Sequence, residues 1–159
     1  MRLSRKSDYA TRAVRYISNL PKGKLGSINR ISEAEQIPRE FLAKILKDLT
    51  RAGILVSYQG VTGGYRLAKQ MNEVTVADII TAVDEPIDAT QCGGKENCHD
   101  DRKCLTHDLW VRLNDQIFDF LRSVTLGELV EEHRAKQAKV VELHDQRPGK
   151  RSQSEPVAA

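Results

Sequence analysis

SINRISEAEQIPREFLAKILKDLTRAGILVSYQGVTGGYRLA, which runs from Ser27 to Ala68, decides the fold of this chain. Ser27 is a suitable N-cap for a short helix, and Pro38 suits the first position of a second one, which Gly53 would end. The second helix carries an apolar stripe that we expect to be buried, made of Phe41, Leu42, Ile45, Leu46 and Leu49. The two helices predict either a helix-turn-helix or an ordinary helical hairpin with a charged, solvated face.

The segment after these two helices favours the helix-turn-helix. Residues 54–58 are typical of a strand, residues 59–64 of a glycine-rich turn, and residues 65–68 of the returning strand. A β-hairpin directly after a recognition helix is the wing of a winged helix. Glycines at its tip let the backbone approach a DNA phosphate or the minor groove closely. We therefore expect a mainly α fold with a small β-hairpin wing.

The charge distribution supports a unit that binds a polyanion. The chain of 159 residues has a net charge of +3, yet residues 1–70 hold 14 Lys and Arg against 5 Asp and Glu, a balance of +9. Residues 71–132 reverse this balance with 5 basic and 14 acidic side chains. A basic first half predicts binding to double-stranded DNA, and the acidic segment that follows predicts a different role.

The candidate DNA contacts lie on the second helix of the pair and on the wing. Arg39 and Lys44 are the strongest candidates, because both fall on the exposed side of the predicted recognition helix. The full set that we expect at the DNA is Ser27, Arg39, Glu40, Lys44, Lys47, Arg51, Gln59, Gly60, Thr62 and Gly63.

The remaining apolar patterns predict further helices at residues 9–20 and 75–83, and Thr75 with Asp78 would cap the second of them. Residues 105–124 carry apolar side chains on one side of about five helical turns, and we expect this long helix to pair with its copy in a homodimer. Thr125 and Glu128 would cap a short helix after it. The predicted divisions are a winged helix-turn-helix domain at 1–72, a cluster-binding loop with dimerisation helices at 73–132, and a charged, disordered tail at 133–159.

Some classes of protein are excluded by composition. No apolar run approaches the roughly 20 residues of a membrane-spanning helix, and residues 1–10 are polar, unlike a signal peptide. We therefore expect a cytoplasmic protein without a membrane partner. The three cysteines make a poor disulfide framework, because an odd count leaves one thiol over and a reducing cytosol opposes pairing.

Cys92, Cys98 and Cys104 follow the spacing C-x5-C-x5-C, and His107 comes three residues after the last of them. If the long helix begins near Cys104, then Cys104 and His107 share one face of its first turn, where the helix dipole favours a thiolate. Three thiolates and an imidazole suffice for zinc or an iron–sulfur cluster, and the long gaps favour the cluster.

The cysteine spacing is also compatible with a metal-free thiol switch and with unrelated cysteines in a loop. An enzyme that uses Cys104 and His107 is disfavoured, because the sequence offers no evident substrate pocket or oxyanion donors.

Further motifs carry a resemblance: the opening MRLS, the DATQC run at 88–92, the CLTHDLW run at 104–110, and TLGELV at 125–130. Together with the glycine-rich wing, they resemble the Rrf2 family of bacterial transcription regulators over about residues 1–132. The resemblance is strongest to the members that regulate iron–sulfur cluster assembly genes. It implies a homodimeric repressor or activator, not an enzyme, whose [2Fe-2S] cluster is held by Cys92, Cys98, Cys104 and His107.

A second branch of the same family, which senses nitric oxide, has a similar cysteine loop. In some of its members an acidic residue of the first helix, from the partner subunit, completes a [4Fe-4S] cluster. Asp8 is the matching residue here, and its alternative role is to complement the dipole at a helix start. The wing has Gln59 where the iron–sulfur regulators usually have an arginine, so the resemblance does not imply the operator sequence.

Overall fold

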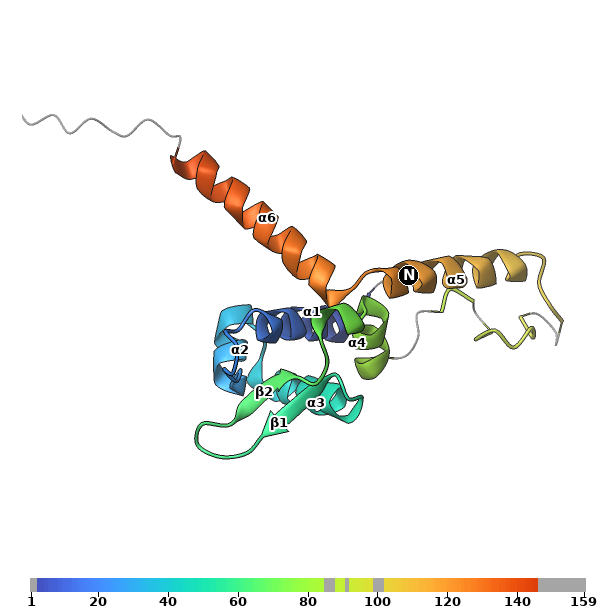
Figure 1. Ribbon diagram of the computed structural model, residues 1–159. Helices are drawn as coiled ribbons and strands as arrows, with labels where there is room; N and C mark the ends of the chain where they lie inside the picture. Colours follow the sequence, from blue (N-terminus) through green and yellow to red (C-terminus); the bar gives the residue numbers. More distant parts are fainter. Residues whose placement is uncertain (1–2, 85–87, 91, 99–101, 146–159) are drawn as a thin grey trace, which may run out of the picture.

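The computed structural model of the protein describes residues 3–84, 88–90, 92–98 and 102–145. Figure 1 shows the first four α-helices and a β-hairpin gathered into one body, from which α5 extends on one side and α6 on the other. The fold is mainly α with a small hairpin, as the sequence predicts. In chain order the elements are α1 (Arg5–Ser18), α2 (Ile28–Glu35), α3 (Arg39–Arg51), β1 (Leu55–Tyr58), β2 (Gly64–Leu67), the 3-10 helix η1 (Met71–Glu73), α4 (Val76–Val83), α5 (His107–Ser123) and α6 (Leu126–Asp145).

Helices α2 and α3 form the helix-turn-helix, which packs on α1. The Ser27 hydroxyl caps α2 by accepting a hydrogen bond from the Arg30 N–H, as the sequence predicts. The turn passes through Gln36, which adopts a left-handed conformation with φ of 52°. Pro38 is the N-cap of α3 and not its first residue, because its ψ of 129° is still extended. Gly53 follows α3 with φ of 73°, a conformation that suits glycine at a helix end.

Strands β1 and β2 form the wing, an antiparallel pair in which Leu55 lies opposite Leu67 and Tyr58 opposite Gly64. The carbonyl of Gly26 adds a bridge to the outer edge of β2 by accepting a hydrogen bond from the Tyr65 N–H at 3.0 Å. A side chain at Gly64 would collide with that carbonyl, since its Cβ would lie 2.7 Å from the oxygen. The packing of the hairpin itself therefore requires glycine there.

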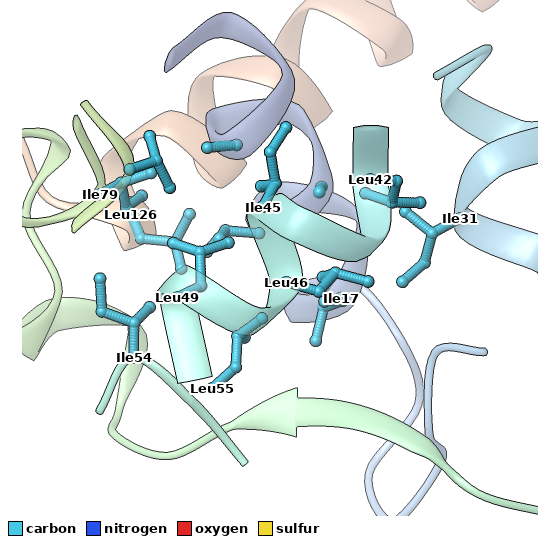
Figure 2. Close-up of a cluster of buried hydrophobic side chains, with 14 of the residues drawn as sticks. Ile17, Ile31, Leu42, Ile45, Leu46, Leu49, Ile54, Leu55, Ile79 and Leu126 are labelled. Carbon is cyan, nitrogen blue, oxygen red and sulfur yellow. The ribbon is translucent and has the colours of Figure 1, made fainter. Parts of the chain in front are cut away.

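The core lies between α1, α3 and α4, with α3 at its centre (Figure 2). Phe41, which the sequence places in the buried stripe of α3, is 40% exposed, and that prediction is wrong. Its ring packs edge to face on Tyr9 of α1, with ring centroids 5.7 Å apart, because it lies at the side of the buried arc of the helix. The buried members of the stripe are Leu42, Ile45, Leu46 and Leu49.

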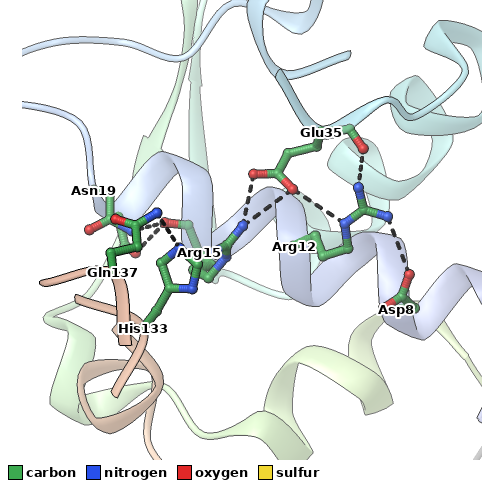
Figure 3. A network of polar contacts seen from close by, with 8 residues as sticks. Asp8, Arg12, Arg15, Asn19, Glu35, His133 and Gln137 are labelled. Atoms are coloured by element: carbon green, nitrogen blue, oxygen red, sulfur yellow. Dashed lines mark hydrogen bonds and ion pairs between the residues drawn. The ribbon is translucent and has the colours of Figure 1, made fainter. Parts of the chain in front are cut away.

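A buried carboxylate joins α2 to α1 (Figure 3). Glu35 is 8% exposed and pairs with Arg12 Nε at 3.2 Å and with Arg15 Nη2 at 3.0 Å. Arg12 also donates to the Glu35 carbonyl and pairs with Asp8, one turn earlier, at 3.5 Å. Because a buried charge is stable only with its partners in place, this network fixes the helix-turn-helix on α1.

The beginnings of α4 and α6 are held together. The N–H of Val76 donates to the Val124 carbonyl at 2.9 Å, and the N–H of Leu126 donates to the Val74 carbonyl at 2.8 Å. Leu126 is fully buried in the core, so α6 starts from an anchored point. Capping boxes begin both helices, as the sequence predicts for Thr75 and Thr125.

Helix α6 is longer than the sequence predicts. It runs from Leu126 to Asp145, so the short helix is wrong, and the expected tail is helical from residue 133 to Asp145. Residues 131–145 lack glycine and proline and are rich in good helix formers, which sustain a helix without an apolar stripe. Where α6 passes α1, Arg134 donates a hydrogen bond to Asn19 Oδ1 at 3.1 Å. Residues 146–159 of the expected tail lie outside the described residues.

Among the described residues, no helix is both long and apolar enough to cross a membrane.

Candidate metal centre and DNA-binding surface

Three predicted ligands converge at the N-terminal start of α5. Cys98 Sγ lies 3.2 Å and Cys92 Sγ 3.5 Å from Nδ1 of His107, and the two sulfur atoms are 3.4 Å apart. All three ligand atoms lie within 4.8 Å of one another. His107 is the first residue of α5 and is 3% exposed, whereas the cysteines come from the loop before it. The loop therefore folds back onto the start of α5.

Cys104 stands apart from this group of three. The sequence would place it with His107 in the first turn only if the long helix began near Cys104, and that condition is not met because Thr106 is the N-cap and α5 begins at His107. Cys104 Sγ lies 3.7 Å from the Thr106 hydroxyl. Cys104 still lines a cavity of about 340 Å³ together with Cys98, His107 and Trp110. It is thus beside the centre without joining the three-atom cluster.

The thiols differ in how readily they lose a proton. Burial opposes ionisation of Cys92, but hydrogen bonds from the Cys98 thiol and the backbone N–H groups of Glu96 and Gly94 outweigh it and lower the pKa to about 7. The Thr106 hydroxyl lowers the pKa of Cys104. At Cys98, a backbone hydrogen bond at Cys104 favours the thiolate, yet burial and the neighbouring thiols raise the pKa.

The donor set fits a thiophilic metal or an iron–sulfur cluster. Thiolate sulfur with imidazole nitrogen suits zinc and iron–sulfur centres, whereas magnesium and calcium prefer oxygen ligands. Metal binding requires deprotonated thiols and a neutral imidazole, and the lowered pKa of Cys92 reduces the free energy needed to release its proton. The cavity beside the three converged atoms leaves room for a group larger than one ion.

Two polar contacts that local sequence patterns do not reveal hold the loop in place. Lys103 Nζ pairs with Asp108 at 2.6 Å and with Glu96 at 3.4 Å, so it ties two parts of the loop region to the first turn of α5. Asn114 of α5 contacts the residues that precede Cys92. Its position seven residues after His107, on the same helix face, is the signal in the sequence that could have indicated it.

Asp8 lies on α1, where it pairs with Arg12. Its side chain is more than half exposed, and it is absent from the cluster of ligand atoms found among the described residues of the chain. The role that the sequence allows for Asp8 needs a partner subunit, so it stays a prediction.

The predicted recognition helix presents a charged face. Arg39, Glu40, Lys44, Lys47 and Arg51 are all exposed on α3. At about 100° per residue they fall within an arc of about 140°, opposite the arc that faces the core. Only the last of them has an ion pair among the described residues, with Asp48 at 3.4 Å. This face is therefore free to meet DNA.

The wing and the start of α2 complete the expected surface. Gln59, Gly60 and Thr62 are exposed at the tip of the hairpin, and Gly60 has φ of 119° with open space around it. Gly63 is half-buried, and a side chain there would collide with the carbonyl of Tyr58. The Ser27 hydroxyl is engaged in capping α2. DNA contacts of these residues remain predictions.

Comparison with known proteins decides the family. The family model of Rrf2, described as an iron-dependent transcriptional regulator, matches residues 3–132. The chain belongs to the Rrf2 family. As a member of the Rrf2 family it is a transcription regulator of a DNA-binding kind, which agrees with the expectation that it is not an enzyme.

Relatives within the Rrf2 family include the HTH-type transcriptional regulator IscR. The IscR of Pectobacterium atrosepticum is 41% identical over 130 residues, which cover 82% of this chain and 79% of the relative. The IscR of Vibrio campbellii is 36% identical over 145 residues, which cover 91% and 83%. This Rrf2 chain is thus IscR-like over most of its length.

Solved structures of the Rrf2 family confirm the fold. CymR, the global cysteine regulator of B. subtilis, gives a TM-score of 0.71 at 23% identity and covers 83% of this chain and 98% of its own. The IscR of T. potens gives a TM-score of 0.71 at 22% identity, with 86% and 91% covered. The winged helix-turn-helix with a long helix after it is therefore the shared architecture.

Proposed function

We propose that this Rrf2 regulator is a homodimer that binds operator DNA and senses iron–sulfur cluster status or redox stress through a [2Fe-2S] cluster. Cys92, Cys98, Cys104 and His107 would hold the cluster. The observation that carries this proposal is the convergence of Cys92, Cys98 and His107 within 4.8 Å. The proposal includes a cytoplasmic location, because such a regulator must reach its operator.

The ligand set favours a labile sensor over a permanent structural site. When bound, a [2Fe-2S] cluster supplies a redox-active centre that oxidation or iron shortage can remove. His107 takes part as a neutral nitrogen ligand, so protonation of its ring competes with binding. Cys104 lies in the cavity wall and would have to approach the other three donors, which a loop outside α5 allows. The alternatives are a [4Fe-4S] cluster completed by Asp8, a zinc centre and a metal-free thiol switch.

The exposed apolar side chains of α5 support the homodimer. Leu109 is 58% and Phe120 is 66% exposed, and both belong to a helix that extends from the body of the molecule (Figure 1). A helix with an uncovered apolar face is stabilised by pairing with its copy. Two subunits would then place two α3 helices in adjacent major grooves, about one DNA turn apart.

The charge of the recognition helix supports DNA binding. Arg39 and Lys44 lie in the N-terminal half of α3, the part of a recognition helix that enters the major groove, where each would contact a base edge or a phosphate. Lys47 and Arg51 lie further along the same face and suit phosphate contacts. Glu40, at the first turn, would accept a hydrogen bond from a cytosine amino group or exclude other bases.

The test compares DNA binding with and without the cofactor. Binding sites are selected from random double-stranded DNA with anaerobically purified protein and with protein stripped of iron. We expect the two preparations to differ at least about tenfold in affinity for the selected sites, which is about 1.4 kcal/mol of coupling. Equal affinity of both forms for every selected site would show that the centre does not control DNA binding.

A further inference from the structure

Asn114 of α5 hydrogen bonds to the residues that lead into the cysteine loop. Asn114 Oδ1 accepts a hydrogen bond from the Ala89 N–H at 2.8 Å, and Asn114 Nδ2 donates to Asp88 Oδ1 at 2.9 Å. Both partners are about 25 residues away along the chain. The contact therefore fixes the loop to the helix and is not a local turn of the loop itself.

Further hydrogen bonds lead from Asp88 through Thr90 toward the segment that contains Cys92. Asp88 Oδ1 accepts hydrogen bonds from the N–H and the hydroxyl of Thr90, both at 2.7 Å. The Thr90 hydroxyl oxygen accepts a hydrogen bond from the Gly94 N–H at 2.9 Å. Cys92 lies between Thr90 and Gly94 in the chain, so the hydrogen bond that joins those two residues spans it. The contacts of Asn114 thus extend to the segment that carries a predicted ligand.

Asn114 and the predicted ligand His107 lie on the same face of α5. His107 and Asn114 are seven residues apart, which is close to two full turns of α5. The same rigid element therefore positions His107 directly and Cys92 through the loop. The relative placement of these two donors depends on whether Asn114 holds Asp88 and Ala89.

We propose that Asn114 is a positioning residue, which sets Cys92 against His107 by fixing the Asp88–Thr90 turn to α5. The inference rests on the proposed function only for the metal centre that these residues would serve. Outer residues that orient metal ligands usually change metal affinity by about 10- to 100-fold when they are replaced. Asn114 itself need not touch the metal.

The test uses the full chain and Co²⁺ as the probe, under nitrogen, because cobalt–thiolate absorption reports the ligand set. The variants are Asn114→Ala, Asn114→Asp, and Asn114→Asp combined with Asp88→Asn. Asn114→Asp sets two carboxylates against each other, whereas the double variant restores a donor opposite an acceptor. Asp115→Asn, at an exposed position of α5 away from both the His107–Asn114 face and the Leu109–Phe120 face, is the matched control. Hydrogen–deuterium exchange of residues 88–98 is measured on the metal-free proteins.

We expect both single variants to weaken Co²⁺ binding at least about tenfold and to speed exchange at Ala89, and the double variant to recover most of both. Asp115→Asn should match the wild type. Wild-type Co²⁺ affinity in Asn114→Ala, or failure of the double variant to recover, would overturn the role of Asn114. A wild-type chain that binds no Co²⁺ would contradict the proposed metal centre instead. In that case, unchanged hydrogen–deuterium exchange in Asn114→Ala would separately overturn the claim that Asn114 fixes residues 88–89 to α5.

Discussion

His107 Nδ1 lies 3.2 Å from Cys98 Sγ, although nine residues separate them along the chain. His107 opens α5, and Cys98 belongs to the loop that leaves α4. The contact exists because the loop folds back onto the N-terminus of α5, where it brings a nitrogen donor against a thiol. The proposed sensing function depends on this contact. In that proposal, the charged face of α3 binds the operator DNA.

Replacing Lys44 by Ala should lower the salt dependence of DNA binding. Each lysine–phosphate contact releases about one counterion, so the slope of log K against log salt should fall by about one unit per subunit and about two per dimer. The measurement is a titration of a selected site at several salt concentrations. Lys139→Ala, on the exposed part of α6, should leave the slope unchanged. A wild-type slope in Lys44→Ala would remove Lys44 from the interface.

Replacing Phe120 by Asp should break the homodimer. Phe120 is 66% exposed in one chain, and a carboxylate buried at that position in a dimer would have no partner. We expect the dimer dissociation constant to rise at least about tenfold in sedimentation experiments. Val61→Asp, an equally apolar and fully exposed position at the wing tip, is the control. If both variants stay as dimeric as the wild type, α5 is not the interface.

Replacing Glu35 by Gln should destabilise the fold. Glu35 neutralises Arg12 and Arg15, and loss of one partner from a buried ion pair costs up to about 3–5 kcal/mol. The arginine side chains are 35% and 24% exposed, so solvent screens them and we expect about 1–3 kcal/mol. Urea unfolding measures this loss, with Glu33→Gln on the exposed side of α2 as the control. Equal stability of the two variants would contradict the role of the network.

The capping box of α6 should make stability depend on pH. Hydrogen bonds from the backbone N–H and the hydroxyl of Thr125 lower the pKa of Glu128 below 4.5. A carboxyl whose pKa is lower in the folded state stabilises the protein above its unfolded pKa, and this contribution disappears as the pH falls through the folded pKa. The free energy of unfolding of the wild type minus that of Glu128→Gln should therefore be constant above about pH 5.5 and shrink below pH 4.5. A difference that does not change with pH would contradict the charged cap.

Much of the fold follows from local patterns in the sequence. Ser27, Gly53 and Thr75 mark helix ends through their own backbone and side-chain chemistry, and the structure has them there. Phe41 shows the limit of such patterns, because its exposure depends on how Tyr9 of another helix packs beside it. The length of α6 could not be predicted for a different reason, since helix propensity without an apolar stripe gives no periodic signal.

The candidate site was predictable in its ligands but not in its geometry. The spacing of the cysteines and His107 is visible in the sequence, whereas the place of Cys104 depends on Thr106 taking the N-cap position. The position of Asn114 on the His107 face of α5 is visible in the sequence, but its partners could not be predicted because they lie about 25 residues away. Long-range hydrogen bonds of this kind appear only once the loop and α5 are placed in space.

The most direct test of the central claim is the iron and acid-labile sulfide content of the full chain purified without oxygen, together with its absorption spectrum. We predict about two irons and two sulfides per chain, with a spectrum that changes in His107→Ala. Zinc alone, or four irons per chain with a spectrum that depends on Asp8, would contradict a [2Fe-2S] cluster held by Cys92, Cys98, Cys104 and His107.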